Sequence, residues 1–118
     1  MALYTKKLIM TTFQEMLAEM PFDKITVSAL VKRAGGSPNT FYYHYQDIYA
    51  LLDDWFQKQV DALVPVGEPI EWKPVTKNIL RECRAHSKTI YHVFDSLSRD
   101  RLDTLFENFL RSAVQDAE

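Results

Sequence analysis

Cysteine and glycine are scarce in this sequence, and its uninterrupted apolar runs are short. The one cysteine, Cys83, excludes an intramolecular disulfide and argues against a cysteine-based metal site, which is typical of a cytoplasmic protein. No stretch approaches the roughly eighteen consecutive apolar residues of a membrane span. The first residues are followed by no small-residue cleavage site of a secretory signal, so we expect them to form a retained helix. We therefore expect a cytoplasmic protein that has no membrane partner.

An excess of positive charge is also lacking, which bears on any nucleic-acid partner. The 14 Lys and Arg side chains stand against 16 Asp and Glu, giving a formal net charge of −2. Residues 1–60 hold six of each sign, namely Lys6, Lys7, Lys24, Lys32, Arg33 and Lys58 against Glu15, Glu19, Asp23, Asp47, Asp53 and Asp54. Affinity for DNA would have to come from the local placement of cations.

Apolar residues recur at helical spacing along most of the chain, and this pattern predicts an all-α fold. The first half is expected to contain helices at about 4–20, 27–34, 38–45 and 47–63. Further helices are expected around 75–83, 90–97 and 100–116. The apolar stripe of the last helix consists of Leu102, Leu105, Phe106, Phe109, Leu110, Ala113 and Val114. Such a stripe needs a partner surface, in the same subunit or in another chain.

Specific residues predict where the short helices begin and end. Thr26 and Asp47 are expected to cap the helices that follow them, because their side-chain oxygens accept hydrogen bonds from free amides. Gly35 can end the second helix in the left-handed conformation. Ser37 and Pro38 together predict the start of the third helix, with Pro38 at its first position.

Composition divides the chain into two helical units. Residues 1–63 are expected to form a three-helix DNA-binding domain with a helix-turn-helix, extended by a scaffold helix at about 47–63. Residues 64–74 are expected to form a loop or hinge, because Pro65, Gly67, Pro69 and Pro74 fall within this short stretch. Residues 75–118 are expected to form a helical effector or dimerisation region, which is only a partial regulatory domain.

Two short helices joined by a glycine-containing turn are the geometry that presents the second helix to a DNA major groove. Phe41 and Tyr45, four residues apart, are expected to face inward and hold this helix on the core. Tyr42, Tyr43 and His44 cannot all face inward as well. DNA contact by these three side chains is therefore the preferred interpretation over an aromatic core helix.

The stretch ITVSALVKRAGGSPNTFYYHYQDIYALL resembles the DNA-binding signature of the TetR family of bacterial transcription regulators. The resemblance extends from the first to the fourth predicted helix, about half of the chain. It implies an all-α helix-turn-helix protein in which Thr26, Lys32 and Arg33 lie near the DNA backbone. It further implies a DNA-facing surface formed by Ser37, Pro38, Asn39, Thr40, Tyr42, Tyr43 and His44.

Two positions depart from the pattern of that family. Gly36 stands where the family usually has a small apolar residue, which predicts a looser turn before the third helix. Ile48 stands where the family often has a lysine that binds phosphate. Losing one phosphate contact should weaken DNA binding and flatten its salt dependence rather than change sequence preference.

The second half contains apolar residues with a few polar groups, a composition typical of an effector pocket. The residues are Cys83, His86, Tyr91, His92, Phe94 and Phe106. Ordinary core packing explains the same residues and is the preferred interpretation, with Cys83 buried as a small apolar side chain. His86 and His92 are separated around one helix and lack a matching carboxylate, so we expect no metal site.

The resemblance implies a transcription regulator, most often a repressor, that binds a double-stranded operator as a homodimer. A small apolar or aromatic effector would release it from DNA. The sequence has no phosphate-binding glycine loop or paired catalytic carboxylates, so no enzyme activity and no cofactor are expected. The alternative functions are a protein-interaction module of the same fold that has lost productive DNA binding, and a ligand-binding protein without a role at DNA.

Overall fold

The computed structural model describes residues 2–64 and 69–117, and it confirms the all-α prediction. Within these ranges the chain forms seven α-helices and one short 3-10 helix, and no strand. The elements in chain order are α1 (Ala2–Glu19), η1 (Phe22–Lys24), α2 (Val27–Ala34), α3 (Pro38–His44), α4 (Ile48–Leu63), α5 (Trp72–Ala85), α6 (Ser87–Phe94) and α7 (Arg99–Ala117). None of the described helices is long and apolar enough to cross a membrane.

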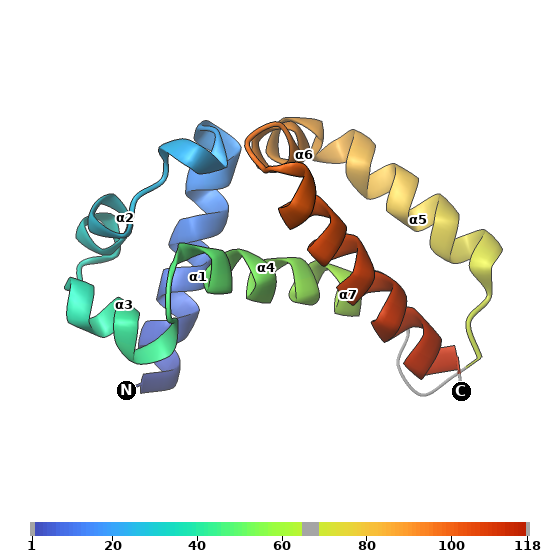
Figure 1. Ribbon diagram of the computed structural model, residues 1–118, viewed down its shortest axis with the longest axis horizontal. Coiled ribbons are helices and arrows are strands. Elements are labelled where there is room, and N and C mark those ends of the chain that lie inside the picture. The colour runs from blue at the N-terminus through green and yellow to red at the C-terminus, as the bar shows by residue number, and fades with distance from the viewer. Residues whose placement is uncertain (1, 65–68, 118) are drawn as a thin grey trace.

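The helices form two groups connected by α4 (Figure 1). Helices α1, α2 and α3 lie on one side, α5, α6 and α7 lie on the other, and α4 runs between them. Helix α6 also contacts α1, so the two groups meet at a second place. The molecule measures 43 × 30 × 26 Å along its principal axes.

One apolar core joins most of the helices. Phe13 and Leu17 of α1 are fully buried against Leu30 of α2 and Phe41 of α3. From α4 the core receives Leu51, Leu52 and Trp55, and from the second group it receives Val93 and Leu105. Each such buried apolar side chain contributes roughly 1.5–3 kcal/mol to folding. Through Val93 and Leu105 in this core, α6 packs against α1 and α7 packs against α4.

The four predicted helix ends are confirmed, three of them with the expected bonding or backbone conformation. The Thr26 hydroxyl accepts a hydrogen bond from the Ala29 amide at 3.1 Å, and an Asp47 carboxylate oxygen accepts one from the Ala50 amide at 2.8 Å. Gly35 ends α2 in the left-handed region, with φ of 82°. Ser37 is the N-cap of α3 and Pro38 its first residue, as predicted, but the expected side-chain bond is absent, because the Ser37 hydroxyl lies 3.2 Å from that of Thr40 and makes no bond to a helix amide.

The connection between the two groups is shorter than its composition suggests. Helix α5 begins at Trp72, and Pro74 lies in its first turn, where an absent amide hydrogen costs no helix bond. Val60 and Val64 form a second small core with Val75 and hold the end of α4 against the start of α5. Residues 65–68 of the predicted hinge lie outside the described residues, as do the side chains of Ala113 and Val114.

Polar contacts reinforce the junction between the two groups. The His92 ring donates a hydrogen bond from Nδ1 to the Leu17 carbonyl oxygen at 2.8 Å, which ties α6 to the end of α1. The Arg101 guanidinium of α7 lies 4.4 Å from the centre of the Tyr49 ring on α4. Burial raises the pKa of Asp53 on α4, and the charge of Arg101 opposes that rise. The second group is therefore joined to α1 and α4, the helices that support α2 and α3.

The prediction that Cys83 is buried is wrong. Cys83 is exposed, and its neighbour Leu80 is 63% exposed, although Val75 of the same helix is buried. The helical spacing of these residues correctly predicts α5 but does not reveal how much of its apolar face is covered. That depends on the neighbouring helices, which leave the second half of α5 partly uncovered.

Candidate nucleic-acid interface

Helices α2 and α3 form a helix-turn-helix whose turn is closed by backbone hydrogen bonds. The Gly36 amide donates to the Val31 carbonyl oxygen at 2.8 Å, and the Gly35 amide donates to that of Lys32 at 3.3 Å. These bonds satisfy carbonyl groups at the end of α2 that would otherwise lack partners. The direction in which α3 leaves α2 is thereby fixed.

Two aromatic side chains attach α3 to the rest of the domain, as predicted. Phe41 is completely buried, and Tyr45 is 6% exposed just after the last turn. The Tyr45 hydroxyl donates a hydrogen bond of 2.6 Å to a carboxylate oxygen of Asp54 on α4. Burial and this bond raise the pKa of Tyr45, so it stays a neutral donor at physiological pH. Helix α3 is thus held at both its middle and its end.

The opposite side of α3 presents polar groups to solvent. Tyr42 is 55% exposed and Tyr43 is 77% exposed, whereas His44 is half-buried with its ring edge-to-face against Tyr43. Ser37, Pro38 and Asn39 at the amino end of α3 are also exposed, and Thr40 is half-buried. The predicted DNA-facing residues at and along α3 therefore lie on or at the edge of one accessible surface.

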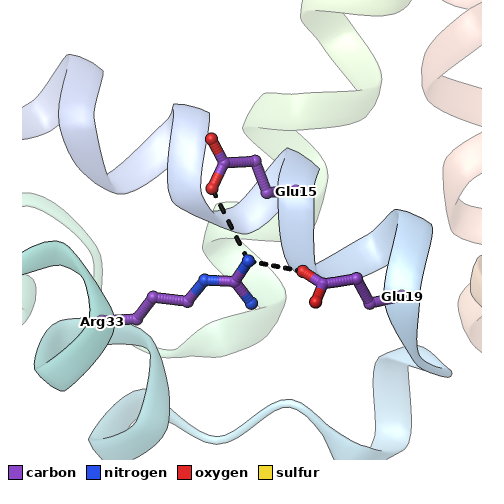
Figure 2. Close-up of polar contacts among 3 residues, drawn as sticks. All are labelled: Glu15, Glu19 and Arg33. Carbon is purple, nitrogen blue, oxygen red and sulfur yellow. Dashed lines mark ion pairs between the residues drawn. The ribbon is translucent and has the colours of Figure 1, made fainter.

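Arg33, one of the cations predicted near the DNA backbone, is engaged within the molecule. Its guanidinium lies 2.6 Å from a Glu19 oxygen and 3.8 Å from a Glu15 oxygen, both on α1 (Figure 2). The hydrogen bond to Glu19 raises the pKa of Arg33. A phosphate would have to compete with these carboxylates, whereas Lys32 on the same turn is exposed.

The first helix contributes the cation Lys6, whose role the sequence alone does not decide. The Lys6 ammonium nitrogen lies 5.5 Å from the centre of the Tyr45 ring, at the end of α3. This cation–π contact places one positive charge beside α3, although residues 1–60 as a whole carry equal numbers of positive and negative side chains. Only tertiary structure brings residues 6 and 45 together.

The two unusual positions have different structural consequences. Ile48 is half-buried and packs against the core at the start of α4, so an apolar contact replaces a cation there. A Cβ atom added at Gly36 would lie 3.7 Å from the Thr40 Cβ, an ordinary contact distance. Gly36 is not in the left-handed region, so the turn does not require glycine at this position.

We predict that Gly36→Ala stabilises the protein, whereas Gly35→Ala destabilises it. The first change reduces the entropy of the unfolded chain at a position with room for a methyl group, and should add about 0.4–1 kcal/mol. The second forces a Cβ into the left-handed conformation and should cost roughly 1–2 kcal/mol. Urea unfolding of both variants measures the difference. Equal destabilisation by the two changes would contradict the geometry of the turn.

Comparison with known families agrees with this geometry. Residues 9–54, which run from α1 into α4, match the family described as bacterial regulatory proteins, tetR family. Residues 9–54 form a TetR-family DNA-binding domain. No curated protein and no solved structure matches the chain. The match covers the helix-turn-helix and identifies the chain as a DNA-binding transcription regulator, as its resemblance to the TetR family implies.

A second candidate site is an open cleft of about 770 Å³ between the two groups of helices. Four residues predicted for an effector pocket line it: Cys83, His86, Phe94 and Phe106. Tyr91 is 63% exposed and His92 is bonded to Leu17, and neither lines the cleft.

Sequence reasoning missed the share of the cleft contributed by α1 and α4. These residues are Thr11, Gln14, Glu15 and Ala18 of α1 and Trp55, Phe56, Gln59, Val60 and Leu63 of α4. Their helical spacing indicates only that they lie on helices. No local signal distinguishes a cleft-lining side chain from one that faces solvent or core.

Proposed function

We propose that this regulator acts in the cytoplasm as a homodimeric repressor that places one α3 in each of two successive major grooves. Each copy supplies one recognition helix, so its operator would be a pseudo-palindrome with half-sites about 34 Å apart. The observation that supports this best is the exposed row of Tyr42 and Tyr43 on a helix whose other side is fixed by buried Phe41. The rigid attachment makes that surface pre-organised for base edges and phosphates.

The proposed contacts divide into two kinds. Thr26, which caps α2, and Lys32 and Arg33 on α2 would bind the DNA backbone and set the orientation of the domain. The residues of α3 would meet both base edges and backbone, and they are Ser37, Pro38, Asn39, Thr40, Tyr42, Tyr43 and His44. A phosphate would have to compete with Glu19 for Arg33, and Ile48 supplies no cation, so little uncompensated positive charge lies at the interface. We therefore expect a shallow dependence of affinity on salt.

We further propose that a small apolar or aromatic effector binds in the open cleft and releases the protein from DNA. The cleft is lined by α1 and α4, which support the helix-turn-helix, as well as by α5, α6 and α7. A ligand that binds better to one spacing of these helices would shift the population toward that spacing. For the effector to release the protein from DNA, the helix spacing that it favours must differ from the spacing at which the two copies of α3 fit successive major grooves.

A second candidate function is a protein-interaction module that no longer binds an operator. The half-buried Ile48 and the balanced charge of residues 1–60 favour it, because both reduce attraction to phosphates. Phe106 and Leu110 of α7 are 51% and 59% exposed and would be available to a protein partner. This candidate requires no preference for any DNA sequence.

Selection of bound duplexes from a randomised pool by electrophoretic mobility shift separates the two candidates. Enrichment of a palindrome at moderate salt is the expected result and would yield the operator. Enrichment of a single half-site would contradict the dimer but retain DNA recognition by α3. If circular dichroism shows that the protein is folded, the absence of any enrichment would reject the regulator proposal and favour the interaction module.

A further inference from the structure

The cleft between the helix groups has predominantly aromatic walls. Trp55 and Phe56 line it from α4, Phe94 from α6, and Phe106 and Phe109 from α7. The rings of Phe94 and Phe106 are parallel, with centres 6.1 Å apart and an interplanar angle of 5°. Aromatic faces carry a negative electrostatic potential, which attracts cations as well as apolar groups.

The charged residues of the cleft have one sign. Glu15 contributes a carboxylate from α1 and Glu82 contributes one from α5. None of the described residues that line the cleft is a lysine or an arginine. His86 is the only basic side chain among these lining residues, and its Nε2 lies 3.4 Å from a Glu82 oxygen.

The positive charge of Arg33 offsets the negative charge of Glu15 only in part. Arg33 lies 3.8 Å from Glu15 but 2.6 Å from Glu19, so Glu19 is its principal partner (Figure 2). The side chain of Glu15 is 58% exposed and that of Glu82 is 52% exposed, so both can turn toward a ligand in the cleft.

We propose that the cleft selects aromatic ligands that carry a positive charge over neutral or anionic ligands of the same shape. This inference rests on the effector cleft proposed above and specifies the chemistry of its ligand. Aromatic walls bind the apolar body of such a ligand and favour its charge, and the two carboxylates add Coulomb attraction. The same carboxylates repel an anion, so charge is discriminated by both attraction and repulsion.

A matched pair of organic ions tests this selectivity. Tetraphenylphosphonium and tetraphenylborate have nearly the same shape and opposite charges, and triphenylphosphine oxide serves as a neutral aromatic probe. Isothermal titration of the full chain measures the three affinities. We expect the phosphonium ion to bind on the order of tenfold more tightly than the borate, because two carboxylates attract one and repel the other.

Variants of the two carboxylates assign the selectivity to the cleft. Glu15→Gln and Glu82→Gln should each lower the phosphonium-to-borate affinity ratio by up to about fivefold, the upper end of the range for a solvent-exposed ion pair. Glu71→Gln is the matched control, since Glu71 is exposed at the start of α5 and does not line the cleft. It changes the net charge equally and should leave the ratio unchanged.

The outcomes separate this inference from the function on which it rests. Equal affinities for all three probes, or a ratio that falls equally in Glu71→Gln, would overturn the charge selectivity while leaving an effector cleft in place. Binding of none of the three probes by the folded protein would overturn both the selectivity and the proposed effector cleft. DNA recognition is measured separately by the duplex selection and is unaffected by either result.

Discussion

Phe41→Ala is expected to cost about 3–5 kcal/mol of the free energy of unfolding, the usual range for removing a buried phenylalanine ring. Phe41 is completely buried in the core that joins α1, α2 and α4. Its ring also makes edge and tilted contacts with Tyr42 and Tyr45, at centre distances of 5.3 and 5.7 Å. Because a domain of this size has only about 5–15 kcal/mol in total, such a loss is large.

The control for this variant lies next to it in the sequence. Tyr42→Ala removes a ring that is 55% exposed on the same helix and should change stability far less than Phe41→Ala. Phe41→Leu keeps much of the buried volume and should fall between the two. Urea unfolding followed by circular dichroism measures all three variants. If Tyr42→Ala destabilised the protein as much as Phe41→Ala, the assignment of inner and outer faces of α3 would be wrong.

The faces of α3 were predictable from sequence because local chemistry determines them. Pro38 begins the helix, Gly35 ends the preceding one, and a four-residue separation puts Phe41 and Tyr45 on one side. The caps at Thr26 and Asp47 follow from the same local rules. Such features need no information about distant residues.

Features that depend on distant residues were not predictable in the same way. The pairing of Arg33 with Glu19 joins α2 to α1, and only the packing of these helices reveals it. The exposure of Cys83 depends on where α4, α6 and α7 leave α5 uncovered. Likewise, the cleft exists because side chains from five helices converge, and no segment alone has its signature.

The double variant Tyr42→Ala/Tyr43→Ala is expected to bind the selected operator about tenfold to a hundredfold more weakly, the range for lost hydrogen bonds to charged groups. Its fold should remain intact, because Tyr42 and Tyr43 are 55% and 77% exposed. Neither side chain is a cation, so the slope of log affinity against log salt should stay unchanged. Fluorescence anisotropy at several salt concentrations measures both the affinity and the slope.

Tyr91→Ala is the matched control for this prediction. Tyr91 is 63% exposed, comparable to Tyr42, but it lies on α6 rather than on the recognition helix. Its removal should leave operator affinity unchanged. Lys32→Ala provides the opposite signature, since loss of a phosphate-binding cation should reduce the salt slope by roughly one and weaken binding to all sequences alike. Wild-type operator affinity in the folded double variant would show that the exposed tyrosines of α3 do not contact DNA.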